Sequence, residues 1–368
     1  MTDRDIIRQF LNDNQVTAVG VTPPRPNLPL EDEPEPENAS LDFDAERPMA
    51  GWKPIPLSEA PAVRGEYPER FIDGSHVSQP VLCIRSRQGY PIPILLAEVG
   101  AVALRLNGRQ FDREFVTVER VLGIVAEPFP WEQMESFAAA LANVPELRLR
   151  VLPARMPNPS LYSPFDYEAM RTQAYSRCQN EMFKLEALAL AAEPNVPTLV
   201  DGQLGGRIGE RAAAARPLLV GAVKAPRPPA FPPVGYNTLL DLKPGQRTPY
   251  YKDRKITDDR VADIPLASWF LRLAGGPRLA PNWGIVRIDI PWVQLCRYAE
   301  DRPRTEFVNR LSRWLIDARC RTDSYARMPV SLDPIVRAED ALKPLFTPTQ
   351  VLVNRLYRTA GLFRGNEL

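Results

Sequence analysis

The segment between Pro23 and Pro61 constrains the fold most strongly, because it contains ten prolines. Proline lacks an amide hydrogen and has a fixed φ, so this stretch cannot form a helix or a central strand. Between Glu31 and Glu46 the stretch carries eight acidic residues and no basic one. We therefore expect an extended arm or linker over residues 21–66, between an N-terminal helix in residues 1–20 and one folded unit over residues 67–368.

The rest of the chain alternates between strand-like and helix-like patterns. Residues 3–18 predict an amphipathic helix with Ile6, Ile7, Phe10 and Leu11 on one face, which could dock on a partner or on the core. Strands are expected at residues 70–76, 80–85, 92–105, 115–125, 196–204, 217–225 and 283–292, and further helices at 130–144, 167–192, 303–319 and 348–361. This order is typical of a mixed α/β layer fold.

Cysteine and histidine usage excludes several kinds of active site. The four cysteines are far apart and form no CxxC pair, so neither a zinc ribbon nor a disulfide framework is indicated. His76 is the sole histidine, which argues against a histidine-rich metal site and a Ser-His-Asp hydrolase. Metal chemistry would therefore have to come from carboxylates, which suit hard ions such as Mg²⁺ or Mn²⁺.

Charge and hydropathy favour an ordinary soluble protein. The net charge is only +1, although arginine is frequent in the C-terminal half. We expect most of these arginines to form a solvated helix face, and a surface that binds phosphates along a nucleic acid is the alternative. The arginines concerned are Arg297, Arg302, Arg304, Arg310, Arg313, Arg319 and Arg321. The apolar stretch from Pro91 to Val102 is too short and too interrupted to cross a membrane, and the acidic N-terminus does not resemble a secretory signal. We expect a cytoplasmic protein.

Two strand-like segments end in the same dipeptide. Asp73-Gly74 follows Phe71-Ile72, and Asp201-Gly202 follows Leu199-Val200. We expect each strand to stop there, with its carboxylate at the sheet edge and the glycine leaving room for a ligand. If the strands are neighbours, the two carboxylates converge, and a divalent cation would relieve their repulsion.

A third carboxylate is expected from the helix before Asp201. Glu186 interrupts an apolar stripe, and a buried carboxylate is costly unless it is paired or metal-bound. Glu181 has Arg177 and Lys184 at helical spacing, which is typical of an ion-pair former. We favour Glu186 as the ligand, but a shift in helix phase would exchange the two.

The order of these motifs resembles the NurA nuclease family. The matching elements are Ile72-Asp73-Gly74-Ser75, a helical glutamate, residues 200–204 (VDGQL) and residues 220–224 (VGAVK), with further similarity in residues 269–273 and in the VRIDIP strand. The resemblance covers roughly residues 70–345. It implies an RNase H-like mixed sheet flanked by helices, and Mn²⁺- or Mg²⁺-dependent DNA cleavage. It also implies a homodimer that works with a HerA-type hexameric translocase in DNA end processing or phage defence.

The C-terminal region departs from the family pattern. The family's tyrosine-proline pair and the later histidine or aspartate are replaced by Met328-Pro329 and by residues 337–340 (RAED), with Tyr325 nearby. Glu339 or Asp340 could supply the missing ligand. This departure motivates a second hypothesis, a catalytically lapsed relative that serves as a DNA-binding or structural subunit of a translocase complex.

The resulting hypothesis is metal-assisted phosphodiester hydrolysis, with Asp73, Glu186 and Asp201 as metal ligands. Lys224, which ends the third strand, either contacts the scissile phosphate or simply leaves the strand for solvent. An RNase H-like nuclease acting on RNA or hybrids remains an alternative.

Three other groups are weaker candidates. Arg247 could contact a phosphate, and Tyr250-Tyr251 could stack on bases, although packing is the favoured role for the tyrosines. His76 is treated as a turn residue outside the catalytic set.

Overall fold

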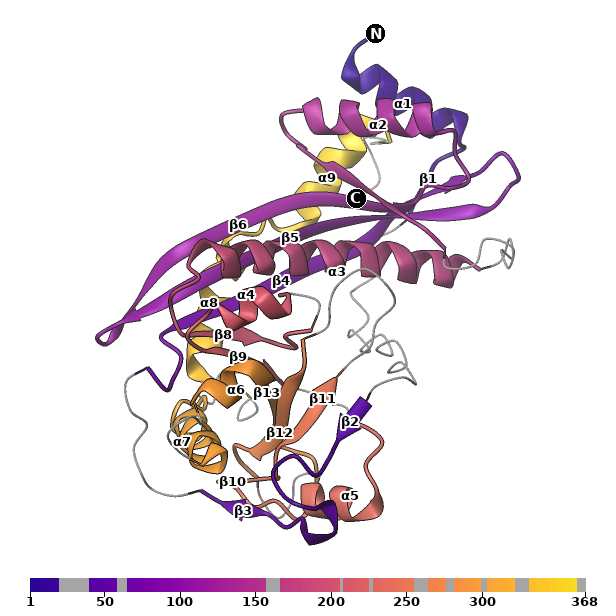
Figure 1. The fold of residues 1–368 in the computed structure, drawn as a ribbon. Coiled ribbons are helices and arrows are strands. Elements are labelled where there is room, and N and C mark those ends of the chain that lie inside the picture. The colour runs from indigo at the N-terminus through magenta and orange to yellow at the C-terminus, as the bar shows by residue number, and fades with distance from the viewer. Residues whose placement is uncertain are drawn as a thin grey trace.

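The computed structural model is built around one large, strongly twisted mixed sheet (Figure 1). The structure describes residues 1–19, 40–57, 65–156, 166–205, 208–224, 228–254, 264–275, 281–298, 303–321 and 331–362. The main path of the sheet runs β2-β11-β12-β13-β9-β8-β4-β5-β6-β7. The expected mixed α/β fold, a sheet flanked by helices, is confirmed.

The strands have the following bounds: β1 Thr17–Ala18, β2 Ser40–Asp42, β3 Ile55–Pro56, β4 Arg70–Arg85, β5 Pro91–Asn107, β6 Gln110–Val125, β7 Arg150–Ala154, β8 Thr198–Asp201, β9 Leu219–Val223, β10 Gln246–Arg247, β11 Tyr251–Arg254, β12 Leu266–Arg272 and β13 Ile285–Pro291. The helices are α1 Asp3–Asp13, α2 Trp131–Asn143, α3 Tyr167–Ala192, α4 Glu210–Ala214, α5 Pro233–Leu240, α6 Trp292–Tyr298, α7 Arg304–Asp317, α8 Asp333–Leu342 and α9 Thr349–Ala360, with 3₁₀ turns η1 Met49–Gly51 and η3 Lys343–Leu345.

Five strands form the centre of the sheet in the order β6-β5-β4-β8-β9. The long strands β4, β5 and β6 are antiparallel, whereas β8 is parallel to both β4 and β9. The connection from β6 to β8 passes through α3, as a parallel crossover requires. The predicted helix over residues 167–192 has these same bounds in the structure.

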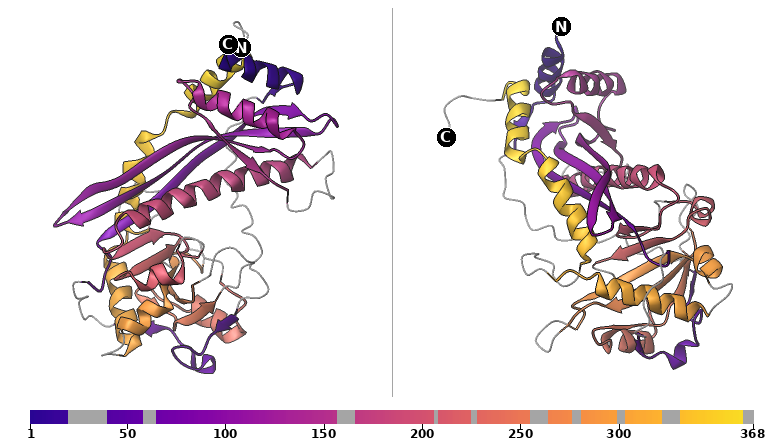
Figure 2. Two further views of the ribbon diagram at one scale, coloured as in Figure 1. Left: turned by 45° about the horizontal axis from the view of Figure 1, so that its top comes forward. Right: turned by 90° about the vertical axis from the view of Figure 1, so that its left-hand side faces the viewer.

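Two helices cover opposite faces of the long strands. A β carbon added to Gly123 of β6 would meet Ala174 and Cys178 of α3, whereas one added to Gly100 of β5 would meet Leu342 of α8. In the right-hand view of Figure 2, α8 and α9 lie on one side of the strands and α3 on the other. We call these the α8 face and the α3 face.

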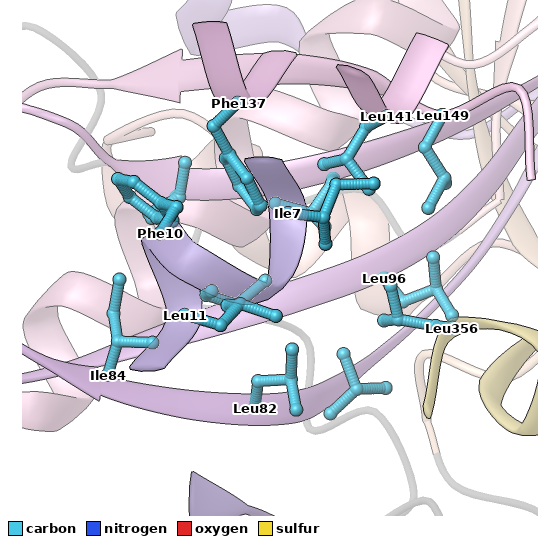
Figure 3. Packing of buried hydrophobic residues seen from close by; sticks show 14 of the residues in the cluster. Ile7, Phe10, Leu11, Leu82, Ile84, Leu96, Phe137, Leu141, Leu149 and Leu356 are labelled. Carbon is cyan, nitrogen blue, oxygen red and sulfur yellow. The ribbon is translucent and has the colours of Figure 1, made fainter. Parts of the chain in front are cut away.

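A separate apolar core closes one end of the long strands. The N-terminal helix α1 packs with α2 and α9 there, and Phe10 stacks on Phe137 of α2 with ring centroids 4.2 Å apart (Figure 3). Of the two alternatives for this helix, docking on the core is the one observed, and α1 ends at Asp13 instead of residue 18. Gln15 has a φ of +50°, which turns the chain so that Thr17 and Ala18 pair with Cys83 and Leu82 of β4.

Part of the proline-rich segment is built into the fold. Ser40–Asp42 pairs with β11 as an edge strand, and Ile55–Pro56 pairs with β10. Glu46 accepts two hydrogen bonds from Arg247, at 2.7 and 2.8 Å, and one from the backbone amide of Tyr250. Residues 20–39 and 58–64 of this segment lie outside the described residues.

The strand that contains Asp73 differs from the expectation. It does not stop at Asp-Gly-Ser but continues as β4 to Arg85, so the strands expected at 70–76 and 80–85 are one. Gly74 does not have a positive φ, and β5 pairs with β4 throughout this stretch. The interruption lies later, as a register shift between Pro80 and Leu82. Apolar strand residues and a long partner strand therefore override the turn preference of Asp-Gly.

Candidate functional site

Asp73 and Asp201 lie next to each other on neighbouring parallel strands. The register of β4 and β8 pairs Phe71 with Leu199 and Ile72 with Val200, so each aspartate is the next residue on its strand. In parallel strands, side chains at matching register point to the same face. Both carboxylates therefore lie on the α8 face, where β8 ends and β4 continues.

The closeness of the two carboxylates changes the pKa of Asp73. Its side chain is only 3% exposed, and burial is the largest cause that raises its pKa well above the ordinary value. The negative charge of Asp201 and a hydrogen bond between the two carboxyl groups raise it further. Two carboxylates at hydrogen-bonding distance repel each other when both are ionised, unless a cation lies between them.

Lys224 supplies positive charge to this pair. It follows β9, whose register with β8 pairs Ala222 with Asp201. The Nζ atom of Lys224 lies 3.0 Å from Oδ2 of Asp201, and the lysine side chain is 13% exposed. Lys224 therefore faces the carboxylates and does not leave the strand for solvent, and its charge lowers the pKa of Asp73.

Helix α8 brings a third acidic side chain towards the pair. The charge of Glu339 contributes to the raised pKa of Asp73, and Glu339 also forms an ion pair with Lys343 at 2.9 Å. Asp340 is exposed. Of the two alternatives left open by the sequence, Glu339 is thus the one close to Asp73. Helix phase could have identified it, because Glu339 lies four residues after buried Ile335 and three before buried Leu342.

Glu186 approaches β4 from the other face. A β carbon added to Gly74 would lie 2.4 Å from Oε1 of Glu186. Since successive strand residues alternate in direction, Gly74 presents the α3 face and Asp73 the α8 face. Glu186 is 2% exposed. It therefore lies beside the backbone that carries Asp73, across β4 from that side chain, and the absence of a side chain at Gly74 makes this contact possible.

Glu181 is an ion-pair residue, as its spacing indicated. Its oxygens accept hydrogen bonds from Arg150 at 2.7 Å, Lys184 at 3.0 Å and Arg177 at 3.2 Å. These cations lower the pKa of Glu181, although burial opposes them. It is more buried than a surface pair, at 6% exposure.

His76 also lies on the α3 face, away from Asp73. Its ring makes an edge contact with Tyr175 of α3, with centroids 4.6 Å apart. Burial lowers the pKa of His76 to about 4, so the imidazole is neutral at pH 7. It belongs to β4 and not to a turn, so that expectation was wrong, but its exclusion from the carboxylate cluster agrees with its position.

The proposed phosphate contact by Arg247 was wrong. The side chain is fully buried, is held by Glu46 and also donates to Asn309 at 2.7 Å. Tyr250 and Tyr251 are also buried, at 3% and 0% exposure, which confirms their packing role.

Several arginines of the C-terminal half have hydrogen-bond or ion-pair partners within the chain. Arg310 pairs with Glu66 and Glu306, Arg313 pairs with Asp317, and Arg297 donates to backbone carbonyls. These contacts favour the ion-paired helix face. Arg302 and the segment with Tyr325, Met328, Pro329 and Val330 lie outside the described residues.

Two of the carboxylates predicted as metal ligands converge, but a third ligand does not join them. Within the described ranges, no group of three or more His, Cys, Asp or Glu side chains has the geometry to hold a metal ion. Asp73 and Asp201 form a convergent pair of oxygen donors, which is the chemistry that Mg²⁺ and Mn²⁺ prefer. Similarly, no helix in the described part of the chain is long and apolar enough to cross a membrane.

The comparisons with known proteins give distant structural likenesses and no likeness in sequence. No protein-family profile and no curated protein matches the sequence. Among solved structures, the NurA nuclease from Sulfolobus solfataricus is similar over 83% of this chain and 87% of that chain, with a TM-score of 0.41 and 10% identity. This likeness is too remote to transfer any residue or activity, so the site stands on its own geometry.

Proposed function

We propose that the protein is a divalent-metal-dependent nuclease that hydrolyses phosphodiester bonds in DNA. The observation that carries this proposal is the convergence of Asp73 and Asp201 on one face of adjacent strands. The sequence motifs shared with NurA nucleases support DNA as the substrate, a homodimeric state and a HerA-type hexameric translocase as partner, in DNA end processing or phage defence.

Each residue of the cluster has a role in this proposal. Asp73 and Asp201 would hold Mn²⁺ or Mg²⁺, and the ion, when bound, would supply Lewis-acid activation of water and phosphate. Glu186, the third ligand predicted from the sequence, lies beside Gly74 on the α3 face, across β4 from the Asp73 side chain, so its proposed role is to position this part of β4 and not to share the ion. Lys224, whose Nζ lies 3.0 Å from Oδ2 of Asp201, would place its ammonium beside a phosphate oxygen of the bound DNA.

The nuclease assay tests the function directly. Purified protein is incubated with linear DNA and Mn²⁺, and Asp73→Asn and Asp201→Asn are compared with Asp317→Asn, which changes a surface ion pair at the end of α7. We expect each site variant to lose cleavage by at least about a thousandfold, the scale of several kcal/mol of lost transition-state stabilisation. Cleavage at the wild-type rate in both Asp73→Asn and Asp201→Asn would overturn the proposal. Matched RNA and hybrid substrates decide the substrate class.

The Lys224–Asp201 ion pair favours one second candidate, a catalytically lapsed DNA-binding subunit. A lysine that permanently replaces the cation would stabilise the carboxylates without any metal. In that case Mn²⁺ would produce neither cleavage nor a shift in the melting temperature. Lys224→Met separates the two candidates: in a lapsed subunit it destabilises the fold with no Mn²⁺ rescue, whereas in a nuclease Mn²⁺ restores the lost stability.

A further inference from the structure

A hollow of about 490 Å³ lies at the outer edge of β6. Its walls come from β5 and β6, from η3, and from the part of the chain that leads from α2 into β7. Glu98 of β5 lines this hollow and pairs with Arg120 of β6, whereas Asp73 of β4 pairs with Val102 of β5, four residues away along that strand. Four strand residues span about 13 Å, so the hollow is separate from the candidate cation site.

The lining of this hollow carries more positive than negative charge. Its charged side chains are those of Arg120, Arg148, Arg150, Glu98 and Glu119. Both glutamates are already bound, because Arg120 donates to Glu98 at 3.0 Å and Arg150 donates to Glu119. Since each of these ion pairs is neutral, the charge that remains is that of Arg148.

Arg148 combines an exposed charge with an unusual backbone conformation. Its φ is +47°, which is uncommon for a residue with a side chain, and its amide donates to the backbone oxygen of Val144 at 2.8 Å. Leu147 and Leu149 on either side are fully buried and hold this conformation. Within the described part of the chain, the guanidinium of Arg148 forms no hydrogen bond or ion pair. The fold thus holds an unpartnered cation at the hollow in a conformation that costs free energy, a combination typical of ligand sites.

Arg120 is fixed in the wall of the hollow. Besides its bond to Glu98, it donates to the backbone oxygen of Leu147 at 3.4 Å and to Oγ1 of Thr347 at 3.0 Å. The second oxygen of Glu98 accepts from the backbone amide of Thr347 at 2.7 Å, and Glu98 is only 5% exposed. A guanidinium held in this way loses little side-chain entropy when an anion binds beside it.

Arg150 is fixed through one nitrogen and leaves the others for a ligand. Its Nη2 atom donates to Glu119 and, at 2.7 Å, to Glu181. Among the residues that the structure describes, none forms a hydrogen bond with Nε or Nη1 of Arg150. Glu181 does not make this region negative, because Arg177 and Lys184 also bind it.

Two apolar side chains, Leu345 and Val118, complete the lining, and Leu345 is 43% exposed. Sites for small molecules, of roughly 300–1,000 Å³, combine such apolar contacts with a few charged groups. We propose that this hollow binds the phosphate group of a nucleotide-sized ligand, with the phosphate at Arg148 and Arg150 and the apolar part against Leu345.

A phosphate monoester fits this lining because it carries about two negative charges and three acceptor oxygens, which match the planar donors of arginine. A free nucleotide and the terminal phosphate of a nucleic-acid strand share this chemistry. The proposed binding needs neither the carboxylate pair nor a divalent ion, so its failure would leave the nuclease assay unaffected.

Calorimetric titration with deoxyadenosine monophosphate tests the site, in a buffer with EDTA so that no divalent ion takes part. We expect Arg148→Gln to raise the dissociation constant by at least about tenfold, because it removes charge-assisted hydrogen bonds to the phosphate. The matched control is Arg313→Gln, which removes an exposed arginine paired with Asp317 and should bind like the wild type. Deoxyadenosine, which lacks the phosphate, should not bind. No binding to the wild type, equal binding to Arg148→Gln, or equal binding of deoxyadenosine would overturn the proposal.

Arg148→Gly separates a ligand-binding role from a structural one. Glycine adopts a positive φ without steric cost, so this variant should be at least as stable as the wild type in urea denaturation. It should still bind deoxyadenosine monophosphate at least about tenfold more weakly. A glycine variant that is clearly less stable would show that the Arg148 side chain supports the fold, which would contradict the proposed role.

Oligonucleotides with and without a 5′-phosphate distinguish the two sources of the phosphate, again in EDTA so that no cleavage occurs. If the strand end is the ligand, the phosphorylated oligonucleotide binds more tightly than both the unphosphorylated one and deoxyadenosine monophosphate, and Arg148→Gln removes this difference. If a free nucleotide is the ligand, the 5′-phosphate adds nothing and the mononucleotide binds most tightly. Either result supports the phosphate site, whereas a 5′-phosphate preference that persists in Arg148→Gln would contradict it.

Discussion

The two Asp-Gly dipeptides are the same in sequence but occupy different structural settings. At Asp201-Gly202 the strand ends and Gly202 turns the chain with a φ of +93°. At Asp73-Gly74 the strand continues for eleven more residues after Gly74, and the glycine instead accommodates Glu186. One glycine is needed for its backbone conformation and the other for its missing side chain. Despite this difference, both aspartates reach the same point, because β4 and β8 are parallel neighbours in register.

Gly74→Ala should show the largest effect. The new methyl group would lie 2.4 Å from a carboxylate oxygen of Glu186, so the Glu186 side chain must leave its buried position, or the helix or the strand must move. We expect a loss of about 3 kcal/mol in the free energy of unfolding, measured by urea denaturation. Gly205→Ala is the control, because no atom lies within 4 Å of the added carbon. Similar losses in the two variants would mean that the contact with Glu186 is not tight.

Glu339→Gln should have the next largest effect, because the charge of Glu339 acts on Asp73. Removing this negative charge weakens the attraction of the site for a cation, so the Mn²⁺ concentration for half-maximal cleavage should rise by about tenfold. Asp340→Asn, one residue away and exposed, should leave it unchanged. The reverse result would assign the α8 carboxylate to Asp340.

Gly202→Ala should have a smaller effect than Gly74→Ala. Here the cost arises from forcing an L-residue into a positive φ, which we expect to lower the free energy of unfolding by about 1 kcal/mol. Gly202→Asn should lose less than the alanine variant, because asparagine tolerates this region better. An alanine variant as stable as the wild type would show that the turn is not conformationally restricted.

The pH dependence of the free energy of unfolding that arises from His76, on the same face of β4 as Gly74, should be the smallest effect. Because the folded-state pKa of His76 is about 4, below its ordinary value, the unfolded chain binds more protons between pH 4 and 6.5. Stability is therefore lost as pH falls through this window, by about 0.7 kcal/mol between pH 7 and 6 for this one group. Chemical denaturation of His76→Gln should show a slope weaker by this amount, and an unchanged slope would contradict a buried neutral imidazole.

Local patterns predicted those parts of the molecule in which local and tertiary preferences agree. The helix over residues 167–192 and the turn at Gly202 follow from periodicity, a terminating proline at 194 and glycine's tolerance of positive φ. The continuation of β4 past Gly74 was not predicted. It depends on pairing with β5, and the turn preference of an Asp-Gly dipeptide takes no account of a partner strand. Likewise, Arg247 looked available for a phosphate because its partner, Glu46, lies 201 residues earlier.

Some residues of the candidate site were likewise predictable from local patterns, and others were not. Asp73 and Asp201 were predicted to converge if their strands were neighbours, and the parallel register of β4 and β8 brings them together. The position of Lys224 was left open by the sequence, and the pairing of β9 with β8 brings it to the same carboxylates. The placement of Glu186 across β4 depends on which helix face meets which sheet face, and that requires the three-dimensional packing.

Calorimetric titration of Mn²⁺ into the metal-free protein tests most directly whether Asp73 and Asp201 form one cation site. The account predicts saturable binding to the wild-type protein at neutral pH, abolished to a similar extent by Asp73→Asn and by Asp201→Asn, with both variants still folded by circular dichroism. Wild-type binding that persists unchanged in either variant, or no binding at all, would contradict it.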